Sequence, residues 1–112
     1  MLAPSSRIRV YVCRRATDMR CSFNGLSGLV RGVLREDPLS GHLFCFFNRR
    51  RNYIKVLYWD TSGYCIWSKR LVGGTFAVPN LKQLSLNELQ SVLDGIDVET
   101  TKRKKRFSFI PA

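Results

Sequence analysis

Two different periods of apolar and polar residues run along the chain, and each predicts a different kind of element. Residues 7–13 alternate polar and apolar side chains as far as Val10, which predicts a strand with one solvated face. From Phe23 to Leu34 the apolar residues recur at spacings of three, four and one, which predicts an amphipathic helix. The helix is expected to end before Pro38, because a proline pushes the preceding residue out of the helical conformation.

A β-meander is predicted by three apolar segments in which aromatic and β-branched residues dominate. These segments cover residues 42–47, 53–59 and 64–71. Asn48 and Asn52 flank the first connection, and Gly63 in the second connection is placed to take a positive φ. After a Gly-Gly turn, a short strand is expected over residues 75–78, stopped by Pro79.

A second helix begins at Ser85, which forms a capping-box pattern with Glu88, and its apolar stripe continues to Ile96. The order of elements, from strand to helix to meander to helix, predicts a single α+β domain. Its sheet is expected to be antiparallel, with both helices packed on one face. We expect this domain to cover residues 1–99 and the basic residues 100–112 to form a flexible tail.

Composition and length restrict the class of protein. The chain has 112 residues, 45% of them hydrophobic, which suits one folded domain. No apolar run approaches the roughly 20 residues of a membrane-spanning helix, and the first residues lack the hydrophobic stretch of a signal peptide. The four cysteines form no C-x-x-C pair and His42 is the sole histidine, so we expect reduced cysteines, no zinc and no cofactor. The expectation is a cytoplasmic protein without membrane contact.

The formal net charge is +11, and its distribution is uneven. Residues 1–84 carry a net charge of +10, residues 85–99 one of −4, and residues 100–112 one of +5. Most of the positive charge therefore belongs to the folded domain rather than to the tail. Such an excess favours a polyanionic partner such as nucleic acid.

Basic side chains of the predicted meander are the candidate contacts to nucleic acid. Arg49, Arg50 and Arg51 lie at the tip of the first hairpin, where long cationic side chains can reach phosphates or a groove. Further lysines and arginines lie on the following strands and in the loop before the first helix. The candidate nucleic-acid-binding residues are Arg20, Arg49, Arg50, Arg51, Lys55, Lys69 and Arg70.

Four more residues are expected to shape this site. Asp18 would orient the loop that carries Arg20, and Asp60 and Gly63 would shape the second hairpin. Trp59 lies among the basic residues, where an aromatic side chain can either stack on a base or pack within the sheet.

No complete catalytic constellation is present, so no catalytic or metal-binding residue is assigned. The chain lacks a phosphate-binding G-x-x-x-x-G-K-S/T motif, and nucleophilic hydrolysis would have only His42 as an imidazole base. Asp18 and Asp60 leave a minor alternative, a metal-dependent nuclease, because such enzymes hold divalent ions with convergent carboxylates. Helix capping by Asp18 and a turn at Asp60 are the simpler interpretations.

Residues 5–97 carry a pattern of specific positions, of which Trp59-Asp60-x-x-Gly63 followed by Lys69-Arg70-Leu71 is the most specific. Other matching positions include Asp18, Met19, Arg20, Gly41, His42, Leu43, Phe44, Gly74, Phe76 and Pro79. In these positions the chain resembles the small TnpB-type accessory proteins of bacterial insertion sequences of the IS-sixty-six family. The resemblance implies a bacterial protein encoded beside a separate, much larger transposase that carries the cutting and joining chemistry. It is distinct from the RNA-guided nuclease that shares the letters TnpB.

Two functions are open on this basis. The first is a non-catalytic accessory factor for transposition that binds DNA through the basic hairpin surface. The second is a protein-interaction module that docks on the transposase without direct DNA binding, through residues 85–97 or through residues 107–110. DNA and the element's transposase are therefore the expected partners, and the oligomeric state is left open.

Overall fold

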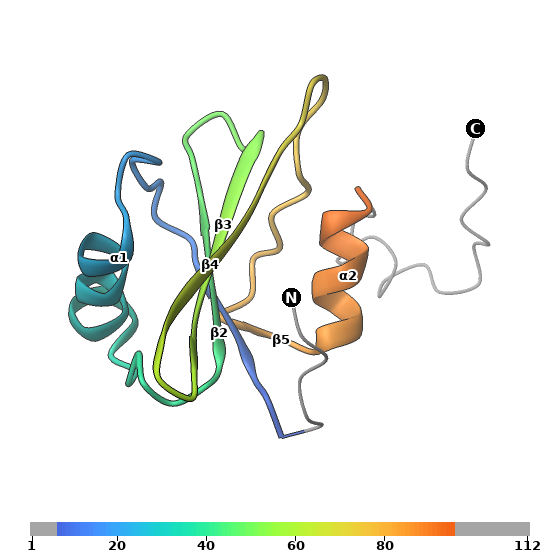
Figure 1. Cartoon of the computed structure of the whole chain (residues 1–112). Coiled ribbons are helices and arrows are strands. Elements are labelled where there is room, and N and C mark those ends of the chain that lie inside the picture. The colour runs from blue at the N-terminus through green and yellow to red at the C-terminus, as the bar shows by residue number, and fades with distance from the viewer. Residues whose placement is uncertain (1–6, 96–112) are drawn as a thin grey trace.

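The computed structural model of the chain describes residues 7–95, which form one α+β domain as the sequence predicts. Figure 1 shows the sheet between two helices, α1 on one side and α2 on the other. The predicted tail, residues 100–112, lies outside the described residues. The elements are β1 (Val10–Cys13), α1 (Phe23–Leu29), the π-helical turn η1 (Val30–Leu34), β2 (Leu43–Phe47), β3 (Tyr53–Asp60), β4 (Gly63–Arg70), β5 (Gln83–Leu84) and α2 (Leu86–Leu93).

The five strands form one mixed sheet in the order β4-β3-β2-β1-β5. The meander of β2, β3 and β4 is antiparallel, as predicted, and β5 is antiparallel to β1. The expectation of an all-antiparallel sheet is wrong, because β1 is parallel to β2, with Val12 opposite Cys45. The helical segment of α1 and η1 connects these two strands as a crossover, and a crossover is what lets neighbouring strands run in the same direction.

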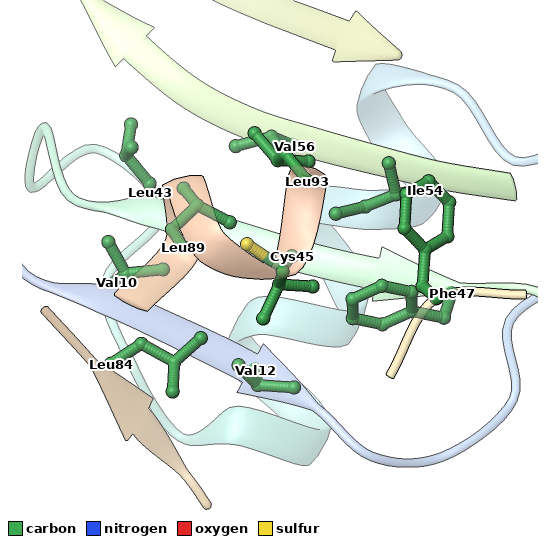
Figure 2. Close-up of a cluster of buried hydrophobic side chains, with 12 residues drawn as sticks. Val10, Val12, Leu43, Cys45, Phe47, Ile54, Val56, Leu84, Leu89 and Leu93 are labelled. Atoms are coloured by element: carbon green, nitrogen blue, oxygen red, sulfur yellow. The ribbon is translucent and has the colours of Figure 1, made fainter. Parts of the chain in front are cut away.

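The two helices cover opposite faces of the sheet, so the expectation that both pack on one face is also wrong. Leu43, Cys45 and Phe47 of β2 point toward the face covered by α2, and the labelled side chains of Figure 2 show this cluster beneath the helix. Phe44 and Phe46 point to the other face, where they join residues of α1 and η1. A strand that is apolar at every position must be buried on both faces, and each face therefore needs its own helix.

Residues 75–78 do not form the expected short strand. The backbone N–H of Phe76 donates to the carbonyl of Arg51 at 2.6 Å, so this segment is tied to the β2–β3 connection instead of to the sheet. The Phe76 side chain is buried edge-to-face against Phe47, with ring centroids 6.0 Å apart. The strand that the sequence did not predict is β5, which pairs with β1.

All four cysteines are free thiols. Cys13 and Cys45 are buried in strands and contribute to the two apolar clusters on either side of the sheet. Complete burial raises the pKa of the Cys45 thiol to about 12, so this side chain stays protonated and acts as a small apolar group. No helix within residues 7–95 has the length and hydropathy needed to cross a membrane.

The predicted capping box of α2 is present. The Ser85 hydroxyl accepts a hydrogen bond from the Glu88 N–H at 3.1 Å, and the Glu88 carboxylate accepts one from the Ser85 N–H at 2.9 Å. Ser22 occupies the corresponding position of α1, but its side chain makes no capping hydrogen bond.

We expect Ser85→Ala to lower the free energy of unfolding by about 1 kcal/mol, because the Glu88 N–H at the start of α2 loses the hydroxyl that accepts its hydrogen bond. Urea denaturation followed by tryptophan fluorescence measures this change. Ser22→Ala is the matched control and should change the free energy by only a few tenths of a kcal/mol. Equal losses in the two variants would contradict the role of the capping box.

Candidate nucleic-acid interface

The carboxyl ends of β1 and β2 lie side by side, because the two strands are parallel neighbours. The chain leaves β1 through Arg14 and Arg15, and it leaves β2 through Asn48 followed by three arginines. These two segments line a small depression of about 160 Å³, to which Arg14, Arg15, Arg49 and Arg51 all contribute. The parallel pairing therefore brings together cations that are more than 30 positions apart in the sequence.

A second, wider depression lies beside the first and has a volume of about 480 Å³. The loop that precedes α1 contributes Asp18 and Arg20, and the β2–β3 connection contributes Arg49 and Arg50. Tyr53 at the start of β3 and Arg70 at the end of β4 are cross-strand partners that complete the lining. The Arg70 guanidinium carbon lies 5.8 Å from the centroid of the Tyr53 ring, so the ring holds this cation at the surface.

Together these two depressions form what we call the basic end of the sheet. Its arginines are all exposed, and Asp18 is the one carboxylate among the residues that line the two depressions. Across residues 7–95 the Arg20–Asp18 contact is the sole ion pair. A dense group of cations with so little compensation creates a positive potential that attracts polyanions. The basic end consists of Arg14, Arg15, Arg20, Arg49, Arg50, Arg51 and Arg70.

Asp18 and Arg20 form a two-pronged ion pair at the edge of the basic end. The carboxylate accepts from the Arg20 Nη2 at 2.7 Å and from Nε at 3.1 Å, and also from the Arg20 backbone N–H at 2.9 Å. The side-chain bonds from Arg20, followed by the backbone bond, lower the pKa of Asp18 from 3.8 to about 2. Because the folded pKa is depressed, the pair stabilises the fold above the unfolded pKa and loses that effect as the pH falls through about 2.

The connection that carries Arg49, Arg50 and Arg51 is fixed from its base by Asn48. The Asn48 side-chain oxygen accepts from the N–H groups of Asn52 and Tyr53 at 3.0 and 3.1 Å. Its side-chain nitrogen donates to the Asn52 side chain at 2.6 Å. A second anchor comes from residues 71–76, because Leu71 donates to the Asn52 carbonyl at 2.8 Å and Phe76 to the Arg51 carbonyl. The three arginines are therefore presented by an ordered loop.

We expect Asn48→Ala to lower the free energy of unfolding by about 1–3 kcal/mol, because two backbone N–H groups and one side chain lose their partners at once. Hydrogen exchange should localise the effect, with the amides of Asn52 and Tyr53 exchanging faster than those of β1. Asn24→Ala, at an exposed position of α1, is the control and should leave these two amides unchanged. Slow exchange of both amides in Asn48→Ala would contradict the anchoring role.

Lys55 and Lys69, both expected to bind nucleic acid, are not part of the basic end. The Lys55 ammonium donates to the Cys21 carbonyl at 2.9 Å on the α1 side of the sheet. The Lys69 ammonium donates to the Leu93 carbonyl at 2.9 Å, at the carboxyl end of α2 on the other side. Both lysines thus satisfy main-chain carbonyls near the two helices, and a cation at a helix carboxyl end also complements the helix dipole.

Trp59, Asp60 and Gly63 also lie away from the basic end. They lie at or beside the β3–β4 turn. Because β3 is eight residues long, this turn lies roughly 25 Å from residues 48–52, the β2–β3 connection that we call the arginine loop. Figure 1 shows the two connections at opposite ends of the sheet. Trp59 packs edge-to-face on Tyr64, with ring centroids 5.2 Å apart. The positive φ of this turn falls on Thr61 and not on Gly63, contrary to the expectation.

The same separation excludes a metal site shared by Asp18 and Asp60, the minor alternative of the sequence analysis. Asp18 is bound to Arg20 at the basic end, and Asp60 lies in the turn at the opposite end of the sheet. The two side chains cannot share a divalent ion, so the nuclease alternative built on them is wrong. Within residues 7–95, moreover, no three His, Cys, Asp or Glu side chains come close enough together to hold a metal ion.

Arg14 and Arg15 are members of the basic end that the sequence did not single out. The reason is the expected strand direction. If β1 were antiparallel to β2, its carboxyl end would lie at the opposite end of the sheet from the arginine loop. The informative feature was their position directly after an apolar strand, matching the position of Asn48 and Arg49 after β2.

Fold and charge define a small α+β protein with one strongly basic end. The chain belongs to the family described as IS66 Orf2 like protein, whose model matches residues 8–103. It is therefore a protein associated with insertion sequences, as the resemblance implied.

Two proteins of Sinorhizobium fredii are similar along most of their length. The uncharacterized protein y4hO is 38% identical over 101 residues, which cover 87% of this chain and 88% of that protein. The uncharacterized protein y4jC is 34% identical over 108 residues, which cover 93% and 92% respectively. No solved structure matches the chain.

Proposed function

We propose that the chain is a non-catalytic accessory factor for transposition that binds the DNA backbone through the basic end of its sheet. The observation that carries the proposal is the convergence of seven arginines on one end of the domain, from three segments: the β1–α1 connection, the β2–β3 connection and the end of β4. The single carboxylate among them is already neutralised by Arg20. Guanidinium groups suit this role because their planar fork donates two parallel hydrogen bonds to a phosphate.

DNA is the polyanion that the family points to, because an insertion sequence is a segment of DNA. The basic end fits backbone contacts better than base contacts for a structural reason. Its arginines project from two loops and one strand end rather than from a helix that could enter the major groove. Contacts of this kind position a protein on DNA without reading much sequence. Under this proposal the cutting and joining steps belong to a separate transposase.

Salt dependence of DNA binding tests the proposal directly. Fluorescence anisotropy with a labelled duplex should give a linear fall of log K with log salt between 50 and 200 mM. For four to seven phosphate contacts the affinity should fall roughly 10²- to 10⁴-fold over this range. Arg31→Ala, at an exposed position in η1 outside the basic end, should leave the slope unchanged. The absence of binding at 50 mM salt would contradict the proposal.

The alternative function is a protein-interaction module that docks on the transposase. It would be favoured if the immobilised protein retained the transposase but bound no DNA. The apolar residues of α2 do not offer a docking surface for it, because Leu89, Val92 and Leu93 are buried in the domain. Docking on α2 would have to use exposed polar residues such as Gln90 and Asp94. The other predicted contact, residues 107–110, lies outside the described residues.

A further inference from the structure

A groove of about 560 Å³ lies where the end of η1 meets β1 and the chain around β5. Its apolar part is formed by Tyr11, Val33 and Leu34. The Tyr11 ring is fixed in place, because it stacks on Phe44 with centroids 5.5 Å apart and meets His42 edge-on at 5.8 Å. Such a volume lies within the range of about 300–1,000 Å³ that is typical of ligand sites.

Charged side chains from three parts of the chain line the same groove. Four of them are cations: Arg14, Arg15, Arg35 and Lys82. None of the four has a carboxylate partner within residues 7–95. The fifth charged side chain is the half-buried Glu36.

This mixture of groups indicates the chemistry of the ligand. A simple anion would use only the cations, would leave the apolar wall uncovered, and would be repelled by Glu36. A nucleotide uses all three features, because its phosphate pairs with cations, its base covers an aromatic and aliphatic wall, and a base amino group donates to a carboxylate. The groove therefore matches a nucleotide better than free phosphate.

Arg35 combines a groove-lining side chain with an unusual backbone conformation. Arg35 ends η1 in the left-handed conformation, with φ of 57°, and Glu36 donates its N–H to the Val30 carbonyl at 3.0 Å. Glycine is the usual residue at such a helix end, since other residues adopt this conformation at a cost. Here the position holds an arginine that lines the groove.

We propose that the groove receives an unpaired nucleotide of a DNA strand whose duplex part lies on the basic end. Arg14 and Arg15 connect the two surfaces, because they line both the groove and the depression between the ends of β1 and β2. The inference rests on the proposed function, since it requires that the basic end hold duplex DNA. It adds that the protein prefers DNA with a single-stranded extension, as at an opened or cut end.

Three labelled duplexes test the inference by fluorescence anisotropy at 0.1 M salt. The first is blunt, the second carries a three-nucleotide adenine extension, and the third carries an abasic extension with the same number of phosphates. The adenine extension should bind at least about fivefold more tightly than the abasic one, since stacking of one base is worth roughly 5- to 150-fold. Equal affinities for the two extensions would overturn the inference.

Arg35→Gly is the variant that reports on the groove, because glycine suits the left-handed backbone and the fold should be retained. It should weaken binding of the adenine extension about eightfold, the worth of one phosphate contact at 0.1 M salt, and leave blunt DNA unchanged. Arg31→Ala should change neither. A loss that is equal for blunt and extended DNA would overturn the role of the groove.

The outcomes separate the inference from the proposed function. If the blunt duplex is bound but bases in the extension make no difference, only the inference fails. If no duplex is bound, both fail. If a glutamate-rich peptide binds through Arg35 while the base preference is absent, the groove is a peptide site and the inference is overturned.

Discussion

Replacing Arg49, Arg50 and Arg51 together with alanine is expected to weaken DNA binding about 500-fold at 0.1 M salt. Each phosphate contact releases counterions and is worth about eightfold at this salt concentration. The slope of log K against log salt should become shallower by about 2.7. Anisotropy titrations of the wild type and the triple variant against one duplex measure both quantities.

The matched control is a second triple variant that removes the same charge elsewhere. Arg7, Arg9 and Arg31 are exposed and do not line the depressions of the basic end. Their joint replacement by alanine should weaken binding far less, because only the long-range field changes. If the two triple variants lose affinity equally, net charge alone governs binding and the basic end has no special role.

We expect Phe44→Ala to lower the free energy of unfolding by about 3–5 kcal/mol, the usual cost of removing a buried aromatic side chain. Phe44 is completely buried, and it packs among residues of α1 and η1 while stacking on Tyr11. Small domains have total stabilities of about 5–15 kcal/mol, so this loss is a large part of the whole. The urea midpoint, with the slope of the transition as a check on two-state behaviour, measures it.

Phe23→Ala is the control for this variant, because Phe23 lies in α1 with 44% of its surface exposed. It should cost less than about 1 kcal/mol, as exposed positions usually do. A small loss in Phe44→Ala would mean that the cluster between the sheet and α1 contributes little to stability. The burial on the second face of the sheet would then have to be reconsidered.

Local features were predictable because local residues determine them. The helix from Phe23 to Leu34 appears as α1 and η1, and the capping box of Ser85 and Glu88 is formed as its pattern indicates. The three strands of the meander lie within one residue of their predicted bounds. Each of these depends on periodicity or on a turn within a few positions.

Strand direction and helix placement were not predictable in the same way, because they depend on how distant segments meet. The direction of β1 follows from the path of the crossover that leads to β2. The placement of the helices could have been inferred, since Leu43 to Phe47 are apolar at both odd and even positions. Such a strand has no solvated face, which already argues against two helices on one side.

In the candidate site, too, local features were predictable and contacts between distant segments were not. The tip position of Arg49, Arg50 and Arg51 follows from the local hairpin pattern. The hydrogen bonds of Lys55 and Lys69 do not follow from a local pattern, because their carbonyl partners at Cys21 and Leu93 are 34 and 24 positions away.

The anchoring of the arginine loop has a consequence for the thermodynamics and rate of association. Its backbone is hydrogen-bonded to residues 71–76, and Phe76 is buried with Phe47 in the apolar cluster under α2. The entropy lost in ordering the loop is therefore part of folding and is not subtracted again when DNA arrives. Encounter should proceed as the docking of preformed surfaces, with a small change in heat capacity and an association rate set mainly by electrostatic steering.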